Sequence, residues 1–194
     1  MTSTQATKAQ SELAMVRQFT QTPGQPLVKL IRTLGLSYDE VEMPAGQSGE
    51  IRYENGRYKI LINATESHAR RRFTAAHELA HYLYHRDMLD DVGSLNRHSD
   101  WLFGTRENDA RPFSPQHETE ANRIAAQILM PAEQVRAEFE KANGDIELLA
   151  DRFDVSEAAM KIRLKVLKLG DYPPLTPRRP APALLHGKAA HPSQ

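Results

Sequence analysis

The order of apolar and polar positions predicts a chain that combines a short sheet with several helices. Around residues 27–34, leucine and isoleucine recur at i, i+3, i+4 and i+7, which is the period of an amphipathic helix. Residues 50–54 and 58–63 instead alternate apolar and polar side chains, as half-buried strands do. Asn55 and Gly56 stand between these two runs, and both residue types tolerate positive φ angles. A tight hairpin is therefore expected there.

Helical periodicity dominates the rest of the chain. It predicts a long helix over about residues 67–86 and a second strong helix over about residues 117–129. Two shorter helices are expected at about residues 145–153 and 156–167. The stretch between the two strong helices, residues 87–116, has little periodicity. Long irregular connections are uncommon in compact domains and often carry function.

The two ends differ in composition from the middle of the chain. Residues 1–25 are rich in threonine, glutamine and serine, and we expect a disordered arm that includes a short helix around residues 11–18. Residues 170–194 hold many prolines, so a disordered tail is expected there. Residues 26–169 are numerous enough to bury a core of their own, and we expect them to form one folded domain.

The overall composition narrows the classes of chemistry and of partner. Basic and acidic residues number 25 each, so the net charge is zero and indicates neither a nucleic acid nor a membrane as partner. The absence of cysteine excludes disulfides, thiolate catalysis and a cysteine-based zinc site. No signal-peptide pattern and no run of about 18 apolar residues is present. We therefore expect a soluble, cytoplasmic protein.

His77, Glu78 and His81 form the pattern H-E-x-x-H inside the first long helix. Four residues return a helix to nearly the same face, so the two histidines project together and can bind one zinc ion. Glu78 is adjacent, and its carboxylate can act as a general base on water without occupying a coordination position. Burying three polar side chains on the apolar side of a helix without a metal would be costly, which favours a metal site.

A catalytic zinc site needs a third protein ligand and one open position. Glu118 on the second strong helix is the favoured candidate, with Asn122 one turn later placed to hydrogen-bond a ligand imidazole from outside the coordination sphere. Glu120 and His85 are the alternatives. His85 lies one turn beyond His81 on the same helix, which suits a supporting or surface position better than ligation.

Two segments, residues 72–81 and residues 118–131, together resemble the ImmA/IrrE family of zinc metallopeptidases. The resemblance extends over about residues 27–168. The chain has Ala80 where the family typically has glycine, and Ile124 where it typically has phenylalanine. Both departures are conservative. The paired motifs in this order are much more specific than H-E-x-x-H alone.

In that family the two motif histidines and a downstream glutamate bind zinc. The resemblance therefore implies that His77, His81 and Glu118 bind Zn²⁺ and that Glu78 is catalytic. It also implies an α+β, zincin-like fold, in which a small antiparallel sheet packs on the motif helix and a mostly helical C-terminal part follows. Family members inactivate helix-turn-helix repressors, so the resemblance implies a zinc-dependent metallo-endopeptidase that derepresses phage, mobile-element or stress-response genes.

Two other functions stay open. Residues 145–169 resemble a helix-turn-helix, and their last helix is basic, so this segment is the one place where direct DNA binding could occur. The protein could also be a regulator that keeps the zinc fold and acts only by binding. The presence of Glu78 favours an enzyme, because a purely structural metal site needs no base.

Peptide hydrolysis also requires a donor that stabilises the oxyanion. The candidates are Tyr82 on the motif helix and three residues of the long connection, His98, Arg106 and Arg111. An extended substrate could pair with an exposed edge of the hairpin, which is a common mode of peptide recognition.

Overall fold

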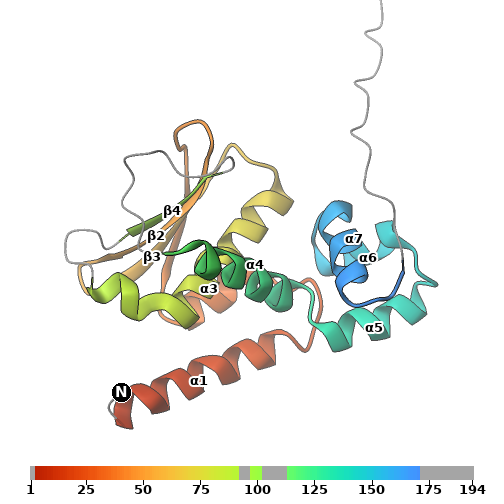
Figure 1. Cartoon of the computed structure of the whole chain (residues 1–194), viewed down its shortest axis with the longest axis horizontal. Helices are drawn as coiled ribbons and strands as arrows, with labels where there is room; N and C mark the ends of the chain where they lie inside the picture. The colour runs from red at the N-terminus through yellow and green to blue at the C-terminus, as the bar shows by residue number, and fades with distance from the viewer. Residues whose placement is uncertain (1–2, 92–96, 102–112, 171–194) are drawn as a thin grey trace, which may run out of the picture.

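A four-stranded sheet lies against one long helix, α3 (His68–Asp91), as Figure 1 shows. The computed structural model describes residues 3–91, 97–101 and 113–170. The strands follow the order β1-β3-β2-β4. Their bounds are β1 (Ser37–Val41), β2 (Gln47–Glu54), β3 (Arg57–Asn63) and β4 (Arg97–Trp101).

The expected hairpin is confirmed. Tyr53 and Glu54 of β2 pair with Tyr58 and Arg57 of β3 in an antiparallel register. The turn residues Asn55 and Gly56 have φ angles of 51° and 78°, which explains the need for two residues that tolerate positive φ.

The sheet is mixed rather than wholly antiparallel. Strand β1, which the sequence did not predict, runs parallel to β3, whereas β2 pairs antiparallel with both β3 and β4. Helices make up most of the remainder, so the α+β fold class is confirmed. Besides α3 they are α1 (Ser3–Phe19), α2 (Leu27–Thr33), α4 (Pro115–Leu129), α5 (Ala132–Lys141), α6 (Ile146–Phe153) and α7 (Glu157–Val166). None of the helices in the described ranges is long and apolar enough to span a membrane.

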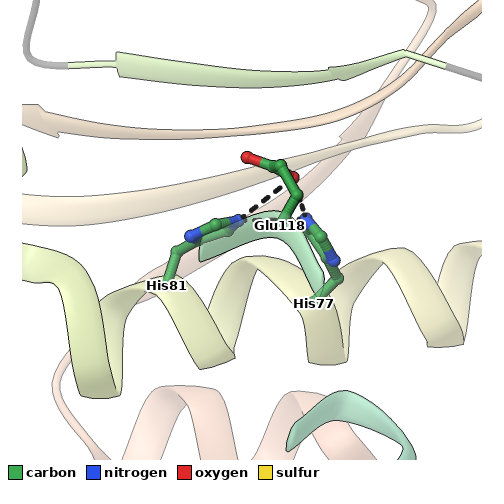
Figure 2. Close-up of side chains that lie close together, drawn as sticks. All are labelled: His77, His81 and Glu118. Atoms are coloured by element: carbon green, nitrogen blue, oxygen red, sulfur yellow. Dashed lines mark hydrogen bonds and ion pairs between the residues drawn. The ribbon is translucent and has the colours of Figure 1, made fainter. Parts of the chain in front are cut away.

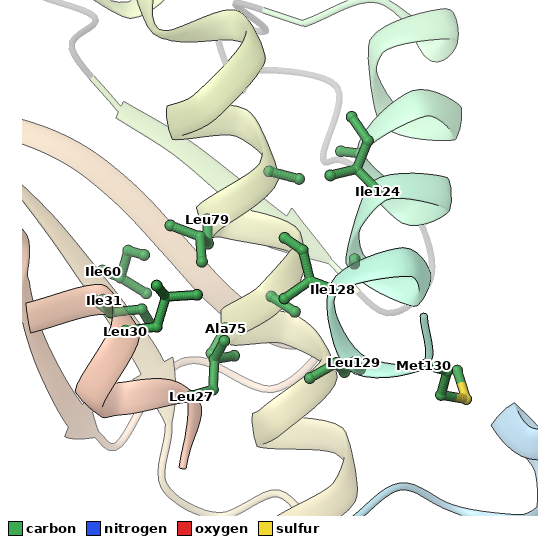
Figure 3. Close-up of a cluster of buried hydrophobic side chains, with 14 of the residues drawn as sticks. Leu27, Leu30, Ile31, Ile60, Ala75, Leu79, Ile124, Ile128, Leu129 and Met130 are labelled. Carbon is green, nitrogen blue, oxygen red and sulfur yellow. The ribbon is translucent and has the colours of Figure 1, made fainter. Parts of the chain in front are cut away.

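The main core lies where α2, β3 and α4 meet α3 (Figure 3). Leu30, Ile60, Leu79 and Ile128 each come from a different one of these elements, and all four are buried. Helix α3 thus packs against the sheet on one side and against α4 on another.

Gly49 of β2 lets α3 come unusually close to the sheet. A Cβ atom at this position would overlap the Cγ2 atom of Thr74 on α3 and would lie 3.1 Å from Cδ1 of Ile62. Thr74 is fully buried and stands one turn before the H-E-x-x-H pattern. The glycine therefore sets the distance between β2 and the helix that carries the candidate site.

Within the expected arm of residues 1–25, residues 3–19 form α1, which is longer than the short helix expected around residues 11–18. Met15 and Phe19 pack on the core, and Glu12 is buried against α3. The Glu12 carboxylate accepts hydrogen bonds of 2.6 Å from both the Tyr82 hydroxyl and the Arg86 guanidinium. Helix α1 is therefore attached to α3 by buried polar contacts, which apolar periodicity alone does not reveal.

The C-terminal helices α6 and α7 begin with side-chain caps, Asp145 and Ser156. Asp154, which ends α6 with a φ of 54°, lies 2.9 Å from Nε2 of His68 at the start of α3. The Arg72 guanidinium also contacts Asp154, at 3.4 Å. These contacts join the turn between α6 and α7 to the N-terminal end of α3. The tail expected at 170–194 lies outside the described residues from 171 onward.

Candidate metal centre

His77 and His81 project from the same side of α3, one helical turn apart (Figure 2). Both are buried, with 3% and 0% of their surface exposed. Their Nε2 atoms lie 3.0 Å apart, so the two rings point at a common site. This is the convergence that the spacing of four residues predicts.

Glu118 completes the cluster from the first turn of α4. Its Oε2 atom lies 3.2 Å from Nε2 of His77 and 3.6 Å from Nε2 of His81. Ser114 caps α4 and Pro115 starts it, so the position of this first turn is well defined. The Glu118 side chain is 34% exposed, so the open side of the cluster lies next to this carboxylate.

The spacing of the three donor atoms fits a tetrahedral metal ion. With metal–ligand distances of about 2.1 Å, the edges of such a tetrahedron are about 3.4 Å long. The observed separations of 3.0, 3.2 and 3.6 Å bracket that value. Within the described ranges, this is the only group of three or more histidine or acidic side chains close enough to hold a metal ion. Two imidazoles and one carboxylate would fill three positions of a tetrahedral metal ion and leave the fourth open.

Asn122 contacts the His77 ring on the side away from the cluster. Its Oδ1 atom lies 3.0 Å from Nδ1 of His77. An amide oxygen can only accept, so Nδ1 carries the proton and donates it, and the Nε2 lone pair faces the cluster. Asn122 therefore fixes both the tautomer and the orientation of the ring.

The alternative ligands His85 and Glu120 do not join the cluster. Nδ1 of His85 lies 3.1 Å from Nδ1 of His81, on the side of that ring that faces away from the three donors. Nε2 of His85 lies 3.3 Å from Oε2 of Glu120. Both residues thus stand behind His81. His117 is also removed from the cluster, since its Nδ1 accepts from the backbone N–H of Ser114.

Phe113 is a site residue that the sequence did not single out. Its ring stacks on the His81 ring with centroids 4.0 Å apart and an interplanar angle of 6°. Phe113 is itself buried. It lies in the irregular connection, where no periodicity marks a position as buried, so this contact follows from the tertiary fold alone.

Glu78 is fully buried beside His77 on α3. Tyr82, one of the candidates for oxyanion stabilisation, donates its hydroxyl to Glu12 instead. Burial and this hydrogen bond raise the pKa of Tyr82 well above its usual value. The side chain of His98 and all of Arg106 and Arg111 lie outside the described residues.

The candidate recognition helix α7 presents fewer cations than its sequence indicates. The Arg163 guanidinium is buried, and its Nε–H donates to the backbone carbonyl of Met130 at 2.8 Å. Burial lowers the pKa of Arg163. Lys165 and Lys168 are exposed. Arg163 therefore ties α7 to the end of α4 and is not available to a DNA phosphate.

The Peptidase_M78 family model, described as the IrrE N-terminal-like domain, matches residues 36–165. A solved structure, a Mycobacterium tuberculosis transcriptional regulator, aligns with a TM-score of 0.52 and 22% sequence identity. The alignment covers 79% of this chain and 46% of that protein, so the chain spans less than half of its length. At this identity the likeness concerns the fold. No curated protein matches the chain.

Proposed function

Because the chain belongs to the peptidase family of IrrE N-terminal-like domains, we propose that it is a zinc-dependent metallo-endopeptidase. One observation carries the proposal. The three donor atoms of His77, His81 and Glu118 converge from two helices at separations that suit one tetrahedral ion. This set of ligands, two histidines and one glutamate with one position left over, is that of a catalytic zinc site.

Each side chain has a distinct role in this proposal. A bound zinc ion would supply Lewis acidity, which polarises the scissile carbonyl and makes water a better nucleophile. Glu78 accepts the proton of the attacking water and delivers it to the leaving amine. Asn122 holds the His77 ring in the tautomer that leaves Nε2 unprotonated. The exposed flank of Glu118 is the side from which a peptide would enter.

The substrate in this proposal is a helix-turn-helix transcriptional repressor in the cytoplasm. Its cleavage would derepress phage, mobile-element or stress-response genes. The resemblance of residues 72–81 and 118–131 to the ImmA/IrrE family supports this assignment. The similarity in fold to a protein described as a transcriptional regulator is consistent with it.

Cleavage of a purified repressor tests the proposal directly. The helix-turn-helix protein encoded nearest to this gene is the first substrate to use. The zinc-loaded protein is expected to yield two fragments, resolved by mass spectrometry. Glu78→Gln is expected to bind zinc as well as the parent while losing at least about 100-fold in rate, because it can no longer take up a proton.

The cleavage assay and a DNA-binding assay separate the alternative functions. Cleavage that persists in zinc-loaded Glu78→Gln would contradict the role of Glu78. Binding of the repressor without cleavage by the parent would favour a regulator that acts by binding alone. Salt-dependent binding of the protein to duplex DNA would favour direct action through α6 and α7.

A further inference from the structure

A chain of hydrogen bonds runs from the metal centre to the surface of α4. It starts at His81, continues through His85 one turn later on α3, and ends at Glu120. The Nδ1 atoms of the two histidines lie 3.1 Å apart. Nε2 of His85 lies 3.3 Å from Oε2 of Glu120. Exposure rises along this chain, from 0% for the side chain of His81 to 5% for His85 and 44% for Glu120.

The donors and acceptors in this chain can be arranged in only one way if His81 binds metal. Binding through Nε2 requires that atom to be unprotonated, so Nδ1 of His81 carries the proton and donates it. Nδ1 of His85 must then accept. The proton of a neutral His85 therefore sits on Nε2, which donates to the Glu120 carboxylate. Each bond in the chain fixes the direction of the next.

We infer that His85 and Glu120 form a positioning relay that holds His81 in the tautomer and orientation needed for metal binding. The inference rests on the proposed zinc site. Neither residue touches the metal position, and both act only through His81. The relay supports His81 as Asn122 supports His77, but with a carboxylate at its end instead of an amide.

The surroundings of His85 favour a fixed ring over a mobile one. His85 is buried, and its ring lies 5.5 Å from Phe113 and 4.8 Å from His117, measured between centroids. Glu120 is held in turn by Arg123, whose Nη2 lies 3.3 Å from Oε1. The Glu120 oxygen that faces His85 is thus not the one that faces Arg123.

The test measures affinity for Zn²⁺ by competition with a chromophoric chelator, with no substrate present. His85→Phe keeps an aromatic ring but removes the acceptor, and it is expected to weaken Zn²⁺ binding about 10–100-fold. His85→Asn places an amide oxygen where Nδ1 stands, so it is expected to recover most of the affinity. His68→Phe removes a histidine from the same helix, away from the site, and is expected to leave affinity unchanged.

A second measurement detects the hydrogen bond from His81 to His85 directly. In Zn²⁺-loaded protein with ¹⁵N-labelled histidine, the Nδ1 proton of His81 is expected to be protected and visible by NMR. It should disappear in His85→Phe and remain in His85→Asn. If His85→Phe fails to fold, Glu120→Ala takes its place and is expected to lose less affinity for Zn²⁺. Its control is Glu133→Ala, which removes an exposed carboxylate on α5.

The outcomes distinguish this inference from the proposed function. Weak Zn²⁺ binding by the parent protein would overturn the proposed zinc site and the relay with it. Tight binding by the parent, together with unchanged affinity and an unchanged His81 Nδ1 proton signal in His85→Phe or Glu120→Ala, would overturn the relay alone. Equal losses in His85→Phe and His85→Asn would also overturn it, because packing and not hydrogen bonding would then explain the effect.

Discussion

Nδ1 of His77 lies 3.0 Å from Oδ1 of Asn122, and this hydrogen bond connects α3 to α4 beside the metal centre. Glu118 stands one turn before Asn122 on α4. The helix that supplies the third donor atom therefore also orients the His77 ring. Any shift of α4 along α3 would disturb both contacts at once.

Replacing Asn122 by alanine is expected to lower the affinity for Zn²⁺ about 10–100-fold, because His77 loses the acceptor that selects its tautomer. Asn122→Asp retains an acceptor oxygen at the same position and is expected to bind nearly as tightly as the parent. Chelator competition measures both constants. Equal affinity in Asn122→Ala and the parent would show that the amide does not orient His77.

Glu118→Ala removes a proposed ligand and is expected to reduce Zn²⁺ affinity by more than the roughly 100-fold that loss of an outer hydrogen bond causes. Glu133→Ala makes the same change in charge at an exposed position in the first turn of α5. It should leave the affinity unaltered. The same chelator competition compares the two, and a similar response from both would argue for a general electrostatic effect instead of ligation.

Glu12→Gln is expected to destabilise the fold by about 2 kcal/mol, since it weakens buried charge-assisted hydrogen bonds from Tyr82 and Arg86. Lys8 also lies near Glu12, at 3.9 Å, but its side chain is 66% exposed. Lys8→Ala should therefore change the free energy of unfolding by less than about 0.5 kcal/mol. Urea unfolding followed by circular dichroism gives both free energies of unfolding. An equally large loss of stability in Lys8→Ala would contradict this prediction.

Tyr82 makes stability sensitive to alkaline pH. Burial and the hydrogen bond to Glu12 raise its pKa, so the contribution of this contact is fully present below the unfolded-state pKa of about 10. It declines as the pH rises from there towards the higher pKa of the folded state. Tyr82→Phe is expected to have a lower free energy of unfolding than the parent at pH 8, and this difference should shrink above pH 10. Urea unfolding measures both proteins, and a difference that grows above pH 10 would contradict the prediction.

Gly49→Ala is expected to cost about 1–3 kcal/mol of stability, because the new methyl group meets the Cγ2 atom of Thr74. Thr74→Ser removes that atom and keeps the hydroxyl. The double variant should recover part of the loss, and the four proteins of the cycle give the coupling energy by urea unfolding. Purely additive losses would mean that α3 is free to move away from β2.

The parts of the site that follow helical periodicity could be predicted from the sequence. His77 and His81 lie one turn apart on a long helix, and Glu118 and Asn122 lie one turn apart on the next strong helix. The spacing within each helix determines which side chains share a face. The structure adds the packing of α4 on α3, which brings the two faces together.

Other features depend on tertiary contacts that the local pattern does not encode. Strand β1 is mostly exposed at the edge of the sheet, so no alternation of apolar side chains marks it. Helix α1 is joined to α3 through Glu12, a residue type that normally indicates solvent exposure. Phe113 contacts His81 from a stretch without periodicity. Helical spacing favours a supporting or surface position for His85 over ligation, but only the fold shows that its ring lies behind His81 and beside Glu120.

Helices α1 and α2 also bear on how the protein should be produced and compared with its relatives. The family match starts at residue 36, after both helices have ended. Yet Leu27, Leu30 and Ile31 of α2 belong to the core that α3 completes, and Glu12 of α1 is buried against the same helix. A recombinant fragment cut at the boundaries of the shared sequence would therefore expose apolar surface and leave Arg86 without its carboxylate. The region that the family model matches is therefore smaller than the region that packs together in the structure.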